Sequence, residues 1–329
     1  MRTPRILLFS FLLFLWAGAE TFAQQTNNPE ALFKDLINKV EAEARMIKEY
    51  HENGDQFKDA KAYFLNEMEI VKTADSFLRL AKGNKNHETD AANVKPIIRG
   101  TVYNLYVGAC QLVNSEPAVT VQLLEEYFRA VTSPQFSELK LTADKNAYYV
   151  YATALEQTNG DKTKIEAALK EALTSDYGVE ACVKLQIIYH AREEYDSAIR
   201  DADIVIGRIN SGTIKEKEIA FYLFHDKAVA LFNSGQYDKA YSTYAEAEAK
   251  YPGHIELMTG ASQSALKQGI IKESDPTTAR QWYQKALTYL KKAEKEFPDK
   301  SEEWGFLIYQ CYHLLGDSAM STKYKKYCE

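Results

Sequence analysis

The stretch that decides the fold is GQYDKAYSTYAEAEAKYP, residues 235–252. Its small and large apolar side chains, Ala240, Tyr244 and Ala247, are three or four residues apart, which is the spacing of one face of an α-helix. A glycine precedes this pattern and a proline follows it, and both are common at helix boundaries. The alanines let a partner helix approach closely, and the tyrosine ring fills the remaining gap. We therefore expect residues 237–250 to form one helix of a packed pair.

The same pattern recurs along the chain. Its alanine, large residue, alanine and proline return 46 residues later, at Ala286, Leu290, Ala293 and Pro298. A further copy begins 34 residues after Ala286, at Met320, and an upstream copy lies 42 residues before Ala240, at Ala198. The spacing exceeds 34 residues where polar stretches, 210–218 and 270–278, separate the copies. A repeated pair of helices with short insertions is expected.

These residues resemble the tetratricopeptide repeat, a 34-residue unit of two helices. Residues 221–254 carry the resemblance best, with Phe224, Ala228, Leu231, Gly235, Tyr237, Ala240, Tyr244, Ala247 and Pro252. Residues 179–210 and 301–328 match in part, and residues 145–177 match more loosely. The resemblance implies an all-α fold, a right-handed superhelix of antiparallel helix pairs in which each pair packs only against its neighbours.

Helical spacing of apolar residues continues over nearly the whole chain after residue 30, and no segment alternates with a period of two. We expect residues 24–142 to form N-terminal hairpins built from degenerate repeats, and residues 143–329 to form tetratricopeptide-like repeats. The polar stretch 82–93 is a possible boundary, so the helices before it could be a separate hairpin. The expected helices span 30–52, 57–82, 94–114, 117–132, 144–158, 162–174, 179–192, 195–209, 217–234, 237–250, 254–268, 277–296, 301–315 and 317–327.

Residues 1–23 have the order of a secretory signal: a basic start, an apolar run from Ile6 to Trp16, and small residues up to Ala23. The apolar run is about ten to fourteen residues long, and a membrane-spanning helix needs about 20. We expect cleavage near Ala23 and a periplasmic or secreted protein with no stable membrane span. The alternative is an uncleaved N-terminal anchor.

Composition excludes several classes of protein. With 46% hydrophobic residues, 15 Gly and 8 Pro in 329 residues, the chain is neither disordered nor collagen-like. Its net charge of −6 argues against nucleic acid as the main partner. The six histidines form no HExxH motif, and no GxSxG or Walker loop occurs. We therefore predict no catalytic residue, no metal and no cofactor. The four cysteines show no CxxC spacing, and we expect buried free thiols.

The resemblance also implies a binding surface. In this family the first helix of each repeat lines a concave groove through repeat positions 2, 5, 9, 12 and 13. Aromatic side chains with polar tips at these positions suit a peptide or a protein surface. The Lys and Asn residues with which some family members hold a terminal carboxylate are missing here. The predicted partner-binding residues are Tyr149, Glu156, Gln157, Tyr222, His225, Phe232, Asn233, Glu256, Gln263, Tyr309, Tyr312 and His313.

The functional hypothesis is an exported, non-enzymatic scaffold that binds a peptide or protein partner on its concave face. One alternative is a glycan- or nutrient-handling accessory protein, and another is an enzyme with an unrecognised site. A protein binder should have an apolar patch with a polar rim. A glycan binder should have co-planar exposed rings, and an enzyme should have a deep pocket with convergent titratable groups.

Overall fold

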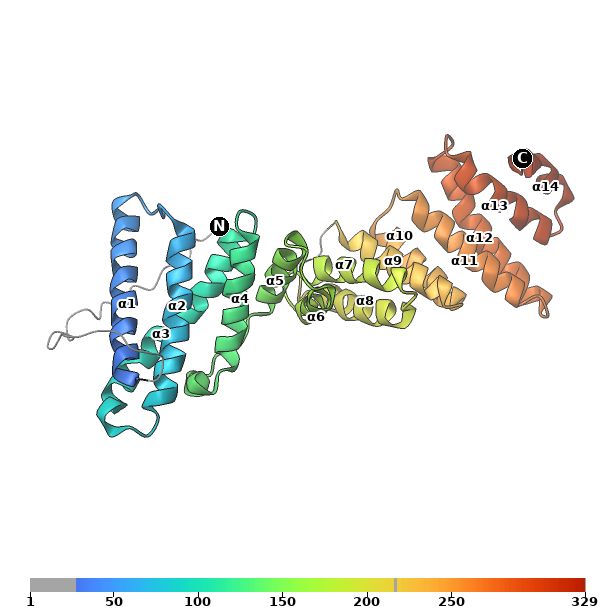
Figure 1. The fold of residues 1–329 in the computed structure, drawn as a ribbon. Coiled ribbons are helices and arrows are strands. Elements are labelled where there is room, and N and C mark those ends of the chain that lie inside the picture. The colour runs from blue at the N-terminus through green and yellow to red at the C-terminus, as the bar shows by residue number, and fades with distance from the viewer. Residues whose placement is uncertain (1–27, 216–217, 329) are drawn as a thin grey trace. The chain divides into compact units, whose positions relative to one another are not determined.

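The computed structural model describes residues 28–215 and 218–328. Over these residues the chain is helical and has no strand, so the predicted all-α fold class is confirmed (Figure 1). The predicted signal, residues 1–23, lies outside the described residues. The α-helices are α1 (Pro29–Glu52), α2 (Ala60–Ala81), α3 (Glu88–Leu112), α4 (Pro117–Thr132), α5 (Lys145–Gln157), α6 (Lys162–Ala172), α7 (Gly178–Ala191), α8 (Tyr195–Asn210), α9 (Ala220–Asn233), α10 (Tyr237–Lys250), α11 (Ile255–Ile271), α12 (Pro276–Glu296), α13 (Ser301–Leu314) and α14 (Ser318–Tyr324). Three short 3₁₀ helices are η1 (Lys85–His87), η2 (Pro134–Leu139) and η3 (Lys325–Tyr327).

The chain divides into two compact units, and the division falls inside α6, between Ala168 and Leu169. In the first unit α1 packs on α2, α2 packs on both α3 and α4, and α4 packs on α5. Helices α1 and α2 are therefore not a separate hairpin, because α2 lies within the core of the unit. The division differs from residue 143, where the sequence places the start of the clearer repeats.

The polar stretch 82–93 is not a break in the fold. Helix α3 begins within it, at Glu88, and continues to Leu112. Glu88 and Asp90 lie in the first turn, where negative side chains are stabilised by the free N–H groups of the helix. The polar composition that suggested a boundary thus marks an exposed helix start.

In the second unit, consecutive helices pair as α7 with α8, α9 with α10, α11 with α12, and α13 with α14. Short loops join these partners, so the two helices of each pair run antiparallel. Helix α9 also contacts α7 and α11, and α11 contacts α13. The first helices of successive pairs therefore form one layer. Packing of each pair against its neighbours is the tetratricopeptide-like arrangement.

The residues that suggested the repeat occupy its core. Ala240 and Ala247 are completely buried, and the ring of Tyr244 between them is buried as well. Polar groups link the two helices of a pair: Ser262 Oγ on α11 donates to the carbonyl oxygen of Ala286 on α12 at 3.1 Å. Close packing of small and large side chains holds the helices together, and such hydrogen bonds satisfy the polar groups that are buried between them.

All four cysteines are free. Cys182 and Cys311 are buried, as expected, but Cys110 and Cys328 are exposed, so the expectation of burial is wrong for these two. Cys110 lies on an exposed part of α3, and Cys328 follows the last helical turn.

The C-terminal residues pack on their own chain. The Tyr327 ring lies against Trp304 of α13, with the ring centroids 5.3 Å apart. It also covers Gly305, where no side chain intervenes. These contacts hold the last helical turn on α13.

Candidate functional site

Each first helix of the second unit presents one stripe of accessible side chains. The stripe follows repeat positions 2, 6, 9 and 13, a spacing of four, three and four residues that keeps it on one side of a helix. None of these residues is buried. We call them together the first-helix face: Glu180, Lys184, Ile187 and Ala191 on α7; Tyr222, Asp226, Val229 and Asn233 on α9; Glu256, Gln263 and Lys267 on α11, where position 6 is a glycine; Glu302, Phe306, Tyr309 and His313 on α13.

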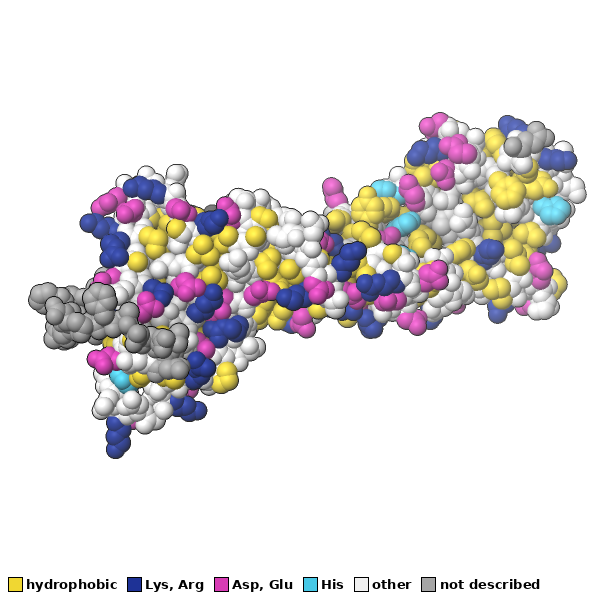
Figure 2. Space-filling model, in the orientation of Figure 1, with side chains coloured by type: hydrophobic (Ala, Val, Ile, Leu, Met, Phe, Trp, Pro, Cys, Tyr) yellow, Lys and Arg dark blue, Asp and Glu magenta, His cyan; other side chains and the backbone are white. Residues whose placement is uncertain are grey.

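Large apolar side chains are exposed on this face. Ile187 is 68% exposed, Tyr222 53% and Phe306 45%, and the three come from different first helices. Polar residues of α11, such as Gln263 and Lys267, lie on the same face. Figure 2 shows the general pattern of the surface, in which hydrophobic patches alternate with charged side chains. Exposed bulky side chains bordered by polar ones are typical of a binding surface.

A cluster of rings lies beside Tyr222. Phe221 contacts Tyr222 edge to face at 5.1 Å and stacks on His254 at 4.0 Å between ring centroids. His225 stacks on the same phenylalanine at 6.0 Å, and its Nδ1 lies 3.0 Å from Asp226 Oδ1. Tyr222 thus lies at the exposed edge of this cluster, where a partner can reach it.

The hydroxyl of the nearby Tyr244 does not ionise near neutral pH. Burial, and to a smaller extent the negative charge of Asp226, raises the pKa of the Tyr244 hydroxyl above its usual value. This hydroxyl therefore stays neutral at physiological pH, and the ring acts as a packing group.

The predicted residues at repeat positions 5 and 12 lie deeper than those on the stripe. His225 is half-buried in the ring cluster, and Phe232 is half-buried against Tyr237, with the ring centroids 5.0 Å apart. Tyr312 is half-buried and stacks on Tyr324 of α14 at 5.8 Å. Successive residues of a helix point about 100° apart, so position 5 turns toward the neighbouring helices when position 6 faces outward.

Sequence reasoning missed the residues at position 6, above all Asp226 and Phe306. A signal for them existed in the sequence, since positions 2, 6, 9 and 13 complete a single helical stripe. The predicted residues Tyr222, Asn233, Glu256, Gln263, Tyr309 and His313 belong to this stripe.

Three predicted residues belong to the other unit. Tyr149, Glu156 and Gln157 lie on α5, where the first two are half-buried and the third is exposed. The structure thus gathers the predicted residues of α9, α11 and α13 into one layer, and those of α5 are part of the first unit.

Helix α13 carries a row of nearly parallel rings. The planes of Phe306 and Tyr309 differ by 26°, with centroids 6.4 Å apart. The planes of Tyr309 and His313 differ by 15°, with centroids 6.0 Å apart. The spacing of three and four residues along the helix produces this row.

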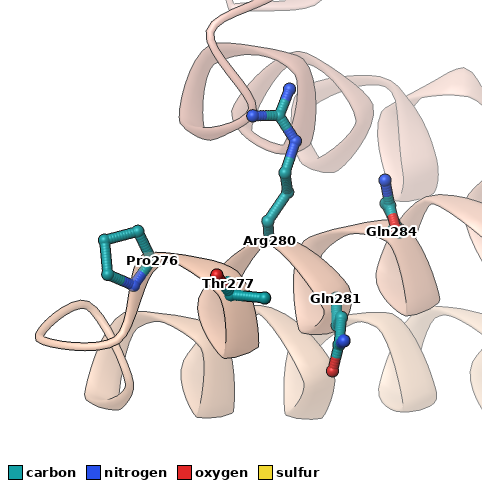
Figure 3. A pocket seen from close by; sticks show the side chains of 5 residues that line it. All are labelled: Pro276, Thr277, Arg280, Gln281 and Gln284. Atoms are coloured by element: carbon teal, nitrogen blue, oxygen red, sulfur yellow. The ribbon is translucent and has the colours of Figure 1, made fainter.

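Two depressions of the second unit lie away from the first-helix face. The smaller has a volume of about 290 Å³ and is lined by successive turns at the start of α12 (Figure 3). Its lining residues are Pro276, Thr277, Arg280, Gln281 and Gln284. Arg280 points away from the helix, and its Nη2 donates to the carbonyl oxygen of Leu315 at 3.3 Å.

The larger depression, of about 560 Å³, lies among α8, α9, α10 and α12. An ion pair crosses its wall, with Lys227 Nζ 2.6 Å from Asp203 Oδ1. No histidine or cysteine lines either depression. The side chains that line them are those of an ordinary polar surface, and they do not pair a nucleophile with a histidine base.

Other reactive groups are dispersed or shielded. Burial raises the pKa of the thiols of Cys182 and Cys311 to about 12, so both stay protonated at neutral pH. Residues 28–215 and 218–328 contain no group of three or more His, Cys, Asp or Glu side chains that could hold a metal ion. Within the same part of the chain, every helix is too short or too polar to span a lipid bilayer.

Together, the helix pairs, their alanine and tyrosine core and the single layer of first helices define a tetratricopeptide-like helical repeat protein. No protein-family model matches the chain. No curated protein matches it either.

Several solved structures share the helical architecture. PilW, described as a widely conserved type IV pilus biogenesis factor, is 14% identical with a TM-score of 0.38, over 68% of this chain and 90% of its own. The C-terminal part of a TPR repeat-containing protein from Cytophaga hutchinsonii is 12% identical with a TM-score of 0.43, over 92% of this chain and 93% of its own. The human IFIT1 dimer with PPP-AAAA is 13% identical with a TM-score of 0.37, over 94% of this chain and 73% of its own. Similarity at this level carries no argument about function, which has to come from the residues of this chain.

Proposed function

We propose that this chain is an exported, non-enzymatic scaffold that binds a peptide or protein partner on the first-helix face. The observation that carries the proposal is the exposure of Ile187, Tyr222 and Phe306 on three helices of one layer. Aromatic side chains in such positions contribute most of the binding energy of many protein interfaces.

The spacing of the helices favours an extended partner. Packed helices lie about 8–10 Å apart, and an extended peptide advances about 3.3 Å per residue. A peptide that crosses the layer would therefore meet a new helix about every third residue. Apolar side chains at that interval would reach Ile187, Tyr222 and Phe306 in turn, and the polar residues of α11 would contact the segment between them.

Export and the absence of catalysis belong to the same proposal. The basic, apolar and small-residue order of residues 1–23 supports delivery to the periplasm or the exterior. The net charge of −6 disfavours nucleic acid, and the protonated buried thiols disfavour cysteine chemistry.

The test is affinity capture from a periplasmic extract with the purified protein, followed by mass spectrometry. We compare the wild type with the double variant Tyr222→Ala, Phe306→Ala. The matched control is Ile204→Ala, which truncates a side chain of similar exposure on the second helix α8. Circular dichroism verifies that all three proteins are helical.

A protein that the wild type and Ile204→Ala capture, and that the double variant loses, supports the proposal. Equal capture by all three proteins would show that binding does not use the first-helix face.

The row of rings on α13 favours a second candidate, a carbohydrate. Nearly parallel rings of Phe306, Tyr309 and His313 would offer a surface on which sugar rings stack. Affinity electrophoresis in gels that contain a soluble polysaccharide tests this function. Retardation of the wild type that Tyr309→Ala abolishes would favour it over protein binding, and unchanged mobility on every polysaccharide would exclude it.

A further inference from the structure

The first unit buries a carboxyl group without a cation. Glu67, on α2, is 0% exposed, and Nδ2 of Asn104 on α3 donates to its Oε1 at 2.9 Å. Within the described part of the chain, neither Glu67 Oε2 nor the hydroxyl of the buried Tyr63 has a hydrogen-bond partner. An ionised carboxylate in such surroundings is costly, because a single amide donor replaces only part of the water that solvated its charge.

A second carboxyl group acts on this site from α1. Burial first, and then the charge of Glu43, raises the pKa of Glu67 well above the usual carboxyl range. Burial also raises the pKa of Glu43. Tyr63 and Asn104 act on Glu67 in the opposite direction, but the pKa of the Tyr63 hydroxyl is itself raised, mainly by burial. The pair is therefore most stable when it retains a proton.

The charges that α4 presents to α2 are engaged elsewhere. Arg129 Nη1 lies 3.1 Å from Oδ2 of Asp75, two turns along α2 from Glu67. The same guanidinium pairs with the buried Glu126, with Nη2 2.6 Å from its Oε1. On α1, Lys39 pairs with Asp35. Arg129 and Lys39 thus have carboxylate partners other than Glu67.

Helix α1 is the element that this pair can control. Leu36 is the one fully buried residue in the described span 29–52, although the helix has 24 residues. Its contacts with α2 include the ring of Phe33 on Phe77, with centroids 5.2 Å apart, and the carboxyl pair. Because α1 packs mainly on one helix, α2, its docking depends on this single interface, and a change at a contact there can release it.

We propose that Glu43 and Glu67 form a proton-binding site that holds α1 on α2, so that loss of the proton releases α1 and uncovers Phe77. The direction follows from linkage. In the released state both carboxyls meet water and have ordinary pKa values of about 4.3. At pH values between this ordinary pKa and the raised pKa values of the docked state, the docked state binds more protons than the released state. Docking therefore weakens as the pH rises. Docking is strongest when the pH is below the ordinary carboxyl pKa. It reaches a constant, weaker level when the pH is above the raised pKa values of the docked state.

The experiment is hydrogen–deuterium exchange of the purified protein at about pH 5, 7 and 9, with protection corrected for intrinsic exchange rates. Protection of α1 should fall by up to about tenfold per pH unit for each proton released. Protection of α9, which lies in the other unit, is the internal reference. An α1 protection that changes no more than that of α9 would overturn the proposal.

Two substitutions on α2 sharpen the test. Glu67→Gln keeps the shape and cannot ionise, so it should flatten the pH dependence of α1 protection. Glu69→Gln is the matched control, because Glu69 is partly exposed and its Oε1 accepts from Lys72 at 3.1 Å, and it should keep the wild-type slope. An unchanged slope in Glu67→Gln would contradict the proposal. If Glu67→Gln does not fold, Glu43→Gln replaces it, with the same expected flattening and the same contradicting result.

Discussion

The ring of Tyr244 on α10 lies directly against the backbone of Gly260 on α11. A Cβ atom at residue 260 would sit 2.5 Å from the ring carbon Cζ, far inside van der Waals contact. The same relationship joins Tyr283 on α12 to Gly269 at the other end of α11. Phe64 and Gly108 repeat it in the first unit. Aromatic rings seated on glycines are thus a recurring way in which neighbouring helices of this protein interlock.

The first prediction concerns Gly260. Gly260→Ala should destabilise the second unit by about 1–3 kcal/mol, because the new methyl group overlaps the Tyr244 ring. Urea unfolding followed by tryptophan fluorescence measures this, since Trp282 and Trp304 lie in the second unit. The control is Gly207→Ala on α8, where a Cβ meets nothing within 4 Å. It should be neutral or stabilise by up to about 1 kcal/mol, from helix propensity. Equal effects of the two variants would disprove the interlocking role.

The second prediction concerns the alanine that suggested the repeat. Ala240→Leu adds several methylene groups at a completely buried position, and should cost about 1–3 kcal/mol of unfolding free energy. Ala249→Leu makes the same change at an exposed position of α10 and should change stability by less than about 0.5 kcal/mol. Thermal unfolding followed by circular dichroism compares the two. A tolerant Ala240 would mean that the two helices of this pair are not in close contact.

The third prediction concerns a buried polar contact of α7 and α8. The hydroxyl of Tyr189 donates to Oδ2 of Asp201 at 2.6 Å, and both residues are buried. Tyr189→Phe should cost about 1–3 kcal/mol, because it leaves a buried carboxylate oxygen unsatisfied. Chemical unfolding measures the loss, and Tyr195→Phe on the half-buried start of α8 is the comparison. A loss no larger than that of Tyr195→Phe would show that water replaces the bond.

The fourth prediction concerns thiol reactivity. Because burial raises the pKa of Cys182 and Cys311 to about 12, neither thiol should react with an alkylating reagent in the folded protein at neutral pH. Raising the pH by one or two units should not change this, since the thiols remain protonated well below that pKa. Cys328, which is exposed, should react readily. Mass spectrometry counts the labels in native protein and in urea, where all four thiols should react. Rapid labelling of Cys182 in the native state would be inconsistent with the buried position.

The sequence alone determined most of the helices of this protein, although not the start of α3 at Glu88. Residues 117–132 and 237–250 were expected as helices, and α4 and α10 have these same bounds. The alanines at 240 and 247 were expected in a core and are buried there. These features could be predicted because helix spacing, end residues and the repeat period are local, and each can be read within a few turns of chain.

Only the tertiary structure decided which side chains stay in contact with water. The stripe through Asp226 and Phe306, the depth of Phe232 and Tyr312, and the burial of Glu67 all depend on helices far away in sequence. A glutamate in a helical pattern is usually solvated. Glu67 lies at helical spacing from Phe64 and Val71, but its burial also requires the helices that pack on this face of α2. Burial is a property of the packed neighbours, so the surface that can bind a partner and the carboxyl that can hold a proton emerged only when the helices came together.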